Sequence, residues 1–250
     1  MFLPTTPEEL AALGWDVLDV ILVTGDTYID HPSSGTAVIG KILHSAGYRV
    51  GIIAQPDITS PAEITRLGEP RLFWGVTGGC VDSMVANYTA TKRKRKSDDY
   101  TPGGENNRRP DRAVIVYANA IRKYFKTTRP IVLGGIEASL RRVAHYDYWD
   151  DKIRRSILFD SKANYLLYGM ADDSILEFAN TLASGTSPES IRGLCFISKQ
   201  PLEGYLELPA FETVAEDKHA FIEMFHTFYQ NNDAITARGL YQRHGDRFLV

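Results

Sequence analysis

Hydrophobic and polar residues follow one another along the chain in blocks that favour strands followed by helices. Short apolar or β-branched runs predict strands at residues 19–25, 48–54, 71–77, 131–133, 165–168 and 194–198. Apolar residues at helical spacing predict helices at residues 34–46, 62–67, 81–91, 111–125, 173–183 and 214–230. Ser34 and Asp111 stand where N-cap residues are expected, and several strands end in glycine.

The alternation of strands and helices predicts the fold class. It is typical of a mostly parallel sheet with helices on both faces, and right-handed crossovers restrict the topology further. We therefore expect an α/β, flavodoxin-like doubly wound fold. No repeat of 20 to 50 residues is found, which excludes solenoids and propellers.

Composition supports an ordinary globular protein. The 250 residues are 44% hydrophobic and 24% charged, which excludes a disordered or collagen-like chain. Two cysteines, Cys80 and Cys195, are too few for a disulfide framework and are expected to be reduced thiols. Residues 1–14 lack Lys and Arg and do not resemble a signal peptide, and no apolar run reaches the length of a membrane span. These features predict a cytoplasmic protein without membrane segments, and the net charge of −3 argues against a nucleic-acid coat.

The carboxyl ends of the predicted strands are the expected position of a ligand site, because doubly wound sheets bind ligands in the crevice there. Glycines at these ends allow the backbone to approach a flat or phosphorylated ligand, and the helix at residues 34–46 points free N–H groups toward it. The alternative is that the glycines only form tight turns. The candidate cofactor-binding residues are Asp26, Thr27, His31, Ser34, Gly35, Thr77, Gly78, Gly79, Gly134, Gly135 and Glu137.

No phosphate-binding motif narrows the ligand further. The chain contains neither Gly-x-Gly-x-x-Gly nor a Walker-type motif after a strand, which argues against classical NAD or ATP binding. The segment Asp30-His-Pro-Ser-Ser-Gly35 occupies the place of the Asp-x-His-x-x-Gly motif of cobalamin-binding domains, but its spacing differs. His31 is therefore either a cobalt ligand or, as we expect, a residue of the crevice wall or the surface.

A dense group of charged and aromatic residues at 136–151 is a second candidate. Arg141 and Arg142 have the chemistry to hold a phosphate or carboxylate, and His145 with Asp147 has the chemistry for proton transfer or metal binding. The alternative is a structural Arg–Asp network beneath an aromatic cap.

Two further groups carry weaker signals. Acidic residues and histidines at helical spacing near the end of the chain suit either a metal site or a solvated helix face, and we assign no metal ligands. These residues are Glu216, His219, Glu223 and His226. A basic run has the charge to contact phosphates, but we expect it to be part of a mobile, solvated loop at residues 92–110. The run consists of Lys92, Arg93, Lys94, Arg95 and Lys96.

Several longer motifs resemble the N-terminal region of the YgiQ-like radical SAM proteins. The motifs are Thr24-Gly-Asp-Thr-Tyr-Ile-Asp-His-Pro32, Tyr100-Thr-Pro-Gly-Gly104, Arg109-Pro-Asp-Arg112, Gly134-Gly-Ile-Glu-Ala-Ser-Leu-Arg-Arg142, His145-Tyr-Asp-Tyr-Trp149, Arg155-Ser-Ile-Leu158 and Tyr168-Gly169. The resemblance runs from about residue 16 to the end. It implies an N-terminal domain similar in layout to cobalamin-binding domains.

The resemblance also implies a catalytic part beyond this chain. Family members carry a radical SAM barrel whose Cys-x-x-x-Cys-x-x-Cys motif holds a [4Fe–4S] cluster that reduces S-adenosylmethionine, whereas this sequence has no such motif. We therefore expect residues 1–212 to form the N-terminal domain and residues 213–250 a helical linker to a missing barrel in a truncated chain. Cobalamin is a further candidate cofactor, and neither the substrate nor an activity of this chain alone is implied.

Two alternatives to an accessory domain remain open from the sequence. A non-catalytic RNA- or protein-binding module would use the basic loop at residues 92–109. A metal-dependent hydrolase would use His145 or the last helix, although neither group completes a recognised ligand set.

Overall fold

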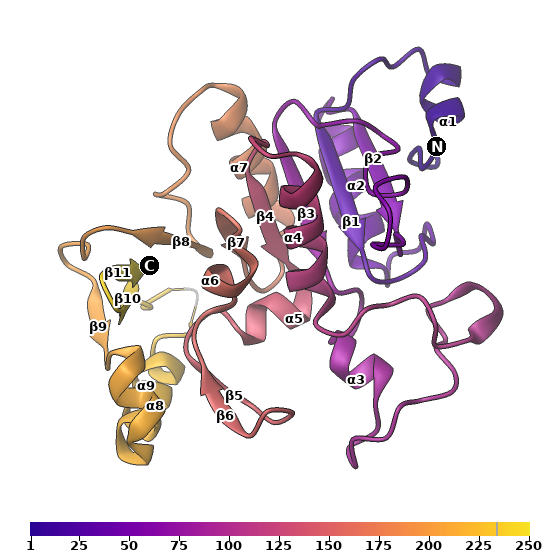
Figure 1. Ribbon diagram of the computed structural model, residues 1–250. Helices are drawn as coiled ribbons and strands as arrows, with labels where there is room; N and C mark the ends of the chain where they lie inside the picture. The colour runs from indigo at the N-terminus through magenta and orange to yellow at the C-terminus, as the bar shows by residue number, and fades with distance from the viewer. Residues whose placement is uncertain (234) are drawn as a thin grey trace.

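The computed structural model describes residues 1–233 and 235–250 and contains one large sheet with helices on both faces (Figure 1). The strands are β1 Val20–Thr24, β2 Val50–Ala54, β3 Phe73–Thr77, β4 Ile131–Gly134, β5 His145–Asp147, β6 Lys152–Arg154, β7 Tyr165–Leu167, β8 Leu194–Ser198, β9 Leu206–Leu208, β10 Leu240–His244 and β11 Arg247–Leu249. The helices are α1 Pro7–Ala12, α2 Gly35–Ser45, α3 Ser83–Asn87, α4 Ala113–Tyr124, α5 Gly135–Leu140, α6 Ile157–Ser161, α7 Asp172–Ala183, α8 Phe211–Glu216 and α9 Lys218–Gln230, with a 3-10 turn η1 at Pro102–Gly104.

The strand order confirms the predicted fold class. The nine-stranded sheet has the order β2-β1-β3-β4-β7-β8-β11-β10-β9, and its first five strands are parallel. The order of those five is the flavodoxin-like order, in which the chain switches direction between β1 and β3. All six strands predicted from the sequence are present, and the sixth, β8, pairs antiparallel with β7.

Alternating strand residues supply the cores on the two faces of the sheet, as the period of a strand requires. On one face, Val23 and Trp74 pack with α4 and α6. On the other face, Leu22 and Phe73 pack with α2 and α7, where Phe178 meets the Phe73 ring edge-on at 5.2 Å. Both faces of the parallel strands are therefore closed by helices, as predicted.

The prediction of a helical linker at residues 213–250 is wrong for its last part. The predicted helix at 214–230 is two helices, because Asp217 ends α8 and caps α9 by accepting the N–H of His219 at 2.8 Å. After α9, β10 and β11 join the large sheet through β8. β10 and β11 are short and contain several polar residues, so the hydrophobic pattern of the sequence does not distinguish them from a polar connector. A domain boundary at residue 212 stays a prediction.

Three local helix predictions also differ from the structure. Residues 62–67 form turns, and the helix predicted at 81–91 is confined to α3. The N-cap of α4 is Arg112, with a φ of 52°, instead of Asp111. The Asp111 carboxylate accepts hydrogen bonds from the Asn87 amide at 2.8 Å and the Tyr88 hydroxyl at 2.7 Å, so tertiary contacts replace the expected cap.

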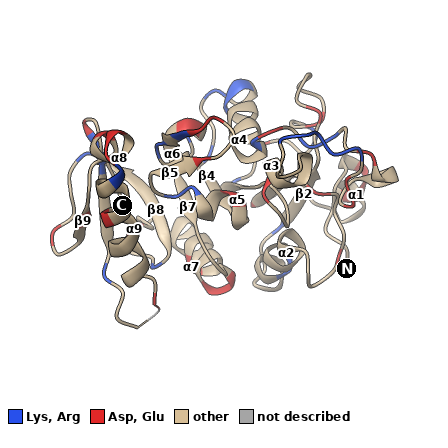
Figure 2. Cartoon of the chain, turned by 90° about the horizontal axis from the view of Figure 1, so that it is seen from below, with Lys and Arg blue, Asp and Glu red and all other residues tan. Residues whose placement is uncertain are grey.

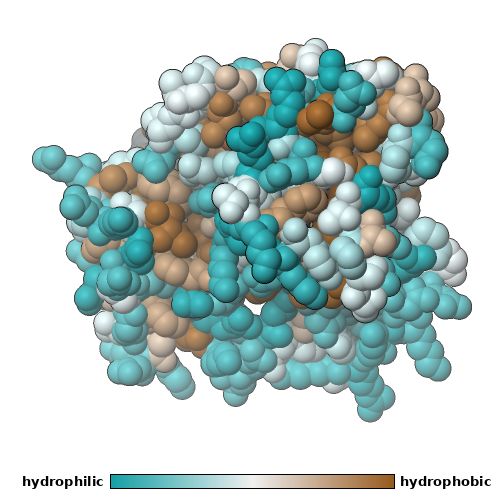
Figure 3. All heavy atoms as spheres, turned by 45° about the horizontal axis from the view of Figure 1, so that its top comes forward, coloured by the Kyte–Doolittle hydropathy of each residue, from teal (hydrophilic) through white to brown (hydrophobic). Residues whose placement is uncertain are grey.

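The surface and the two cysteines are as expected for a globular protein of this composition. Hydrophobic side chains on the face shown in Figure 3 lie in patches separated by hydrophilic ones. Among the described residues, no helix combines the length and apolarity needed to cross a bilayer. Cys80 and Cys195 are free thiols, as predicted, the first exposed and the second buried.

Candidate functional site

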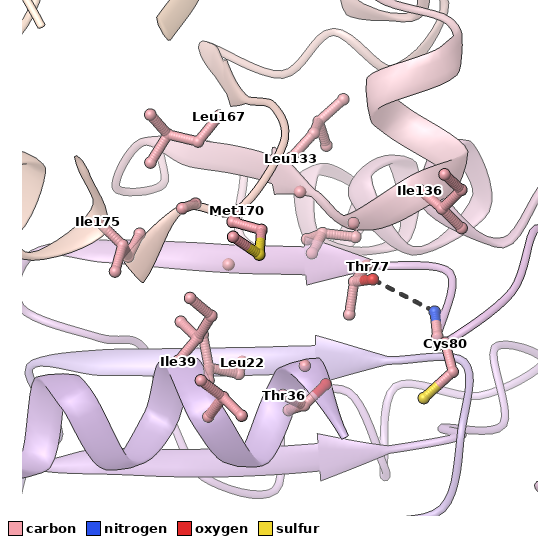
Figure 4. Close-up of a pocket in the computed structure, with 18 of the residues that line it drawn as sticks. Leu22, Thr36, Ile39, Thr77, Cys80, Leu133, Ile136, Leu167, Met170 and Ile175 are labelled. Atoms are coloured by element: carbon pink, nitrogen blue, oxygen red, sulfur yellow. Dashed lines mark hydrogen bonds between the residues drawn. The ribbon is translucent and has the colours of Figure 1, made fainter. Parts of the chain in front are cut away.

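A cavity of about 470 Å³ lies at the carboxyl ends of the parallel strands, between α2 and α7. Leu22 and Ile39 form its wall on the side of β1 and α2, and Leu167 and Ile175 form the wall on the side of β7 and α7 (Figure 4). The turns that follow β3 and β4 border the same cavity. It is therefore a predominantly apolar site at the position where doubly wound sheets bind ligands.

Two glycines at this edge are required by the backbone. Gly79 and Gly135 have φ angles of 112° and 79°, which strain any other residue. A Cβ atom on Gly79 would also collide with the Asp26 carboxylate, and one on Gly135 would collide with the Thr77 side chain. The tight turns alone therefore explain why glycine is needed at these two positions, although both residues also line the cavity.

The predicted cofactor-binding residues divide into two groups. Those that line the cavity are Asp26, Gly35, Thr77, Gly79, Gly134 and Gly135. Those that do not line it are Thr27, His31, Ser34, Gly78 and Glu137. Sequence reasoning missed Cys80 and the aliphatic walls, because apolar residues on buried elements are indistinguishable from core residues. Cofactor binding by the lining residues stays a prediction.

His31 lies on the exposed loop before α2, outside the cavity. Its Nδ1 accepts the backbone N–H of Ser33 at 3.1 Å and lies 2.7 Å from the Ser33 hydroxyl. The imidazole ring thus contacts only the turn at residues 31–33, on the surface of the protein, among the hydrogen bonds of the described residues. This position fits the expectation that His31 belongs to the surface.

Asp26 joins the cavity to a buried ion-pair cluster. Its carboxylate lies 2.6 Å from Arg109 Nη2 and accepts the backbone N–H of Cys80 at 2.6 Å. Arg109 also pairs with Asp98 at 3.3 Å, and its Nε donates to the Gly25 carbonyl at 2.9 Å. Burial raises the pKa of Asp26, whereas the Cys80 N–H and Arg109 act in the opposite direction. The cluster holds the ends of β1 and β3 to the loop at residues 92–110.

That loop is not the mobile, solvated segment that its composition predicts. Residues 92–97 are exposed, but Asp98, Thr101 and Asn106 are buried. Gln55 Nε2 donates to the Thr101 hydroxyl at 2.7 Å, and Asn106 Nδ2 donates to a backbone carbonyl of α3 at 3.1 Å. The loop therefore packs on the ends of β1 and β2, and none of its residues lines the cavity.

The same packing removes support for an RNA-binding module. Arg109 has no exposed side-chain surface, so it is unavailable to a nucleic acid. Arg95 Nε donates to the carbonyls of Val85 and Tyr88, and Lys92 Nζ donates to the Trp149 carbonyl at 3.1 Å. Part of the basic run thus serves to attach the loop to neighbouring segments.

Glu137 has a structural position instead of a place in the cavity. Its carboxylate is buried and accepts the backbone N–H groups of Ser83 at 2.9 Å and Val114 at 3.1 Å. These groups lie in the first turns of α3 and α4, whose unpaired N–H groups favour an acceptor. Burial, reinforced by nearby Asp82, raises the pKa of Glu137. The side chain therefore holds the starts of α3 and α4 together.

The cluster at residues 136–151 is mainly the structural Arg–Asp network. Asp147 accepts from Arg112 at 2.8 Å and lies 3.4 Å from Arg154. Burial alone would raise the pKa of Asp147, but these hydrogen bonds and those of nearby backbone N–H groups lower it to about 2. Arg141 pairs with Asp82. These charges are already satisfied within the fold.

His145 and Arg142 take other positions. His145 Nδ1 lies 3.1 Å from the Val143 carbonyl, and burial lowers the pKa of the ring to about 4. No hydrogen bond joins His145 to Asp147 in the described part of the chain, so the structure does not assemble the proton-transfer pair. The Arg142 guanidinium lies between the rings of Tyr168 and Phe228, with its carbon 4.4 Å from each ring centre.

The acidic residues and histidines near the end of the chain do not converge. Glu216 belongs to α8, whereas the other three lie on α9, and all four are exposed. Over residues 1–233 and 235–250, no group of three or more His, Cys, Asp or Glu residues is arranged to hold a metal ion. The four residues thus have the exposure of a solvated helix face, and Ile222 and Phe225 of α9 are exposed as well.

Comparisons with known proteins place the chain among longer relatives. The sequence profile of a family described as Radical SAM N-terminal matches residues 2–250. A UPF0313 protein of Fusobacterium nucleatum is 58% identical over 250 residues, which cover 100% of this chain and 44% of the relative. A UPF0313 protein of Thermotoga maritima is 53% identical over 253 residues, again 44% of its length. The chain thus spans less than half the length of these relatives.

A search of solved structures found a more distant similarity. The radical S-adenosylmethionine methyltransferase TsrM from Kitasatospora setae, solved with cobalamin and a [4Fe–4S] cluster bound, matches with a TM-score of 0.46 at 18% identity. The same enzyme with its tryptophan substrate and a SAM analogue matches with a TM-score of 0.46 at 21% identity, over 71% of this chain and 28% of that one.

Proposed function

The chain belongs to the Radical SAM N-terminal family, as its motifs predicted, and we propose that it is the ligand-binding accessory domain of a radical SAM enzyme. The radical chemistry would reside in a catalytic part of the longer protein. The chain's own residues do not suit a [4Fe–4S] cluster, which requires several cysteine thiolates. It has two cysteines, and burial raises the pKa of Cys195 to about 12.

The observation that carries the proposal is the cavity between α2 and α7. Its walls are aliphatic, its mouth is lined by backbone at Gly79, Gly134 and Gly135, and it has a volume of about 470 Å³. Such a cavity suits a flat heterocyclic group. We propose that it receives a nucleotide-like group, either a free nucleotide or the nucleotide tail of a cobalamin.

Polar groups at the mouth would orient the ligand. The helix α2 starts at Gly35, and its first N–H groups lie at the cavity, where they favour a phosphate. Thr77 at the end of β3 lines the same opening. The apolar walls would exclude water from the ring, and the helix start would receive the phosphate. Bound cobalamin would supply methyl-transfer chemistry at its cobalt, which this domain would only position.

Exposed apolar side chains at this edge of the sheet, of which Ile136 and Met170 line the cavity, support a position of the edge against the catalytic part. Ile136, Leu140 and Met170 are exposed by 44, 60 and 94%, and all three follow the carboxyl ends of β4 or β7. Exposed apolar groups gathered at one edge are typical of an interaction surface. We propose that this edge faces the radical SAM domain of the longer protein, so that the cavity opens toward the reaction site.

Isothermal titration with hydroxocobalamin and with AMP tests the proposal. Gly134 lines the cavity, and a Cβ atom there meets only the Leu167 carbonyl at 3.9 Å, so we expect a leucine at this position to be accommodated and to fill part of the cavity. We expect saturable binding of at least one ligand and at least tenfold weaker binding by Gly134→Leu. The control Ala183→Leu adds apolar volume on the exposed end of α7 and should bind normally. Absence of heat with both ligands, or unchanged binding by Gly134→Leu, would contradict the proposal.

A further inference from the structure

A second cavity, of about 260 Å³, lies on the other half of the sheet, and we call it the arginine groove. Its lining residues come from β8, β9, β10 and β11, from residues 189–193 and from the end of α9. None of its lining residues lines the cavity between α2 and α7. The two sites are therefore separate, and the arginine groove is independent of the function proposed above.

Arg142 occupies a fixed position in the wall of the arginine groove. Its guanidinium carbon lies over both the Tyr168 and the Phe228 ring, 4.4 Å from each ring centre. One of its amino groups donates to the Ser139 carbonyl. These two ring contacts and the hydrogen bond hold the guanidinium in place, and among the described residues its Nε and Nη2 donate to no protein acceptor. An arginine held in this way is preorganised for an acceptor in the plane of the guanidinium.

The charges of the arginine groove are unbalanced. Three arginines, Arg142, Arg192 and Arg238, line it, and Glu189 is the only acidic side chain among its described lining residues. None of the three arginines forms an ion pair within the part of the chain that the structure describes. Arg238 Nη2 donates only to the Gly204 carbonyl, at 3.0 Å. Elsewhere in the molecule, buried arginines such as Arg109 face carboxylates.

Burial supports the same conclusion. It lowers the pKa of Arg142, and the neighbouring groups that oppose this shift are the Cys195 thiol and the Tyr168 phenol, both neutral at pH 7. A half-buried guanidinium without a carboxylate is stabilised when an anion binds beside it. The groove therefore has more positive than negative side-chain charge in its lining, and a bound anion would reduce this excess.

We propose that the arginine groove binds a small molecule bearing an oxyanion, with Arg142 as the central contact and Arg192 and Arg238 at the rim. The oxyanion is a phosphoryl or a carboxylate group, because both match the geometry of a guanidinium edge. The Tyr205 and Tyr241 side chains, which also line the groove, would cover the rest of the ligand. The volume suits a metabolite of this kind better than a folded partner, which would need a flat and larger surface.

Binding of pyrophosphate and of citrate to the 250-residue chain, measured by isothermal titration at fixed ionic strength, tests the assignment. Arg142→Gln removes the central charge, and the double variant Arg192→Gln/Arg238→Gln removes two exposed ones without disturbing buried packing. The matched control is Arg243→Gln, which removes the same charge from an exposed position on β10 outside the groove. Circular dichroism verifies that each variant is folded.

We expect one site for at least one of the two anions, weakened at least tenfold by Arg142→Gln and at least threefold by the double variant, and unchanged in Arg243→Gln. Preference for pyrophosphate would identify a phosphoryl ligand, and preference for citrate a carboxylate. Equal affinity in all variants, or equal loss in Arg243→Gln, would overturn the proposal. So would binding of an acidic peptide in the absence of either small anion, because the groove would then be a protein contact.

Discussion

The carboxyl ends of the parallel strands form one edge of the sheet, but the two sides of this edge are built differently. On the side of α4 and α6, buried carboxylates and arginines are paired, as in the clusters around Arg109 and Asp147. On the side of α2 and α7, aliphatic side chains leave a cavity of about 470 Å³. Figure 2 looks onto this edge and shows charged residues gathered near α4, α6 and residues 92–110, with mostly uncharged ribbon between α2 and α5.

This difference shows which residues carry structure and which leave room for a ligand. On the side with the most charged residues in the sequence, the buried carboxylates are paired with arginines, so these groups have little capacity left for a substrate. The side with small and aliphatic residues has an opening and few internal polar contacts. In this protein, segments of high charge density in the sequence therefore form structural ion pairs. The candidate site lies instead where strands end in glycine beside two amphipathic helices.

The largest expected effect on stability follows from removing one partner of the buried ion pairs on the side of α4 and α6. Arg109→Met leaves the buried carboxylates of Asp26 and Asp98 without their cation. Removal of one partner from a buried ion pair costs about 3–5 kcal/mol of stability. We expect a loss of that size in the free energy of unfolding measured by urea titration, together with release of the loop at residues 92–110.

Arg93→Met is the matched control, because Arg93 is exposed in the same loop. It should change the free energy of unfolding by less than about 0.5 kcal/mol, as is usual for surface substitutions. A loss below about 1 kcal/mol in Arg109→Met would show that the ion-pair cluster does not hold the strand ends together.

A second, smaller effect on the free energy of unfolding should follow from lowering the pH. His244 is buried between the Phe159 and Phe211 rings, and burial lowers the pKa of its ring to about 4. Because the unfolded chain keeps the ordinary histidine pKa of about 6.5, it binds more protons than the folded chain between these values. Stability is therefore complete above pH 6.5 and falls as the pH drops toward 4. His145, whose pKa is also lowered to about 4 by burial, acts in the same direction.

Urea titrations at pH 7 and pH 5 measure this dependence. We expect His244 to account for a loss of about 2 kcal/mol between the two values, since each unit of pKa difference corresponds to about 1.4 kcal/mol. His244→Phe should reduce the loss by that amount, whereas a cavity variant such as Ile39→Val should leave the pH dependence unchanged, because no histidine lines that cavity. An identical pH dependence in His244→Phe would contradict the assignment.

The sequence allowed much of the parallel half of the fold to be predicted, for a physical reason. β1 and β2 are buried on both faces, so their residues form continuous apolar runs that a surface strand would not show. The later strands were harder to predict. β10 contains Gln242 and His244, both buried, and the Gln242 side chain is held by contacts distant in sequence, such as the Ala144 N–H at 2.9 Å from its Oε1. No local pattern encodes such partners.

For the candidate site, the sequence allowed only its position in the fold to be predicted. The rule for doubly wound sheets selected the ends of β1, β3 and β4, and part of the selected residues line the cavity. Glu137 was selected because it follows β4, but its carboxylate turns toward the starts of α3 and α4. Which polar groups face the cavity and which face each other depends on side-chain packing, and the sequence pattern does not specify it.

The smallest expected effect tests whether the cavity is truly less closely packed than the other face. Ile121 of α4 has no exposed surface, and Ile→Val in a close-packed core costs about 0.5–1.5 kcal/mol. Ile39 of α2 lines the cavity, so part of its side chain already faces empty volume and has fewer contacts to lose. We expect Ile121→Val to lower the free energy of unfolding by about 1 kcal/mol and Ile39→Val by less than about 0.5 kcal/mol. Equal losses at the two positions would mean that the face under α2 and α7 closes over the cavity in solution, which would also remove the main support for a ligand site there.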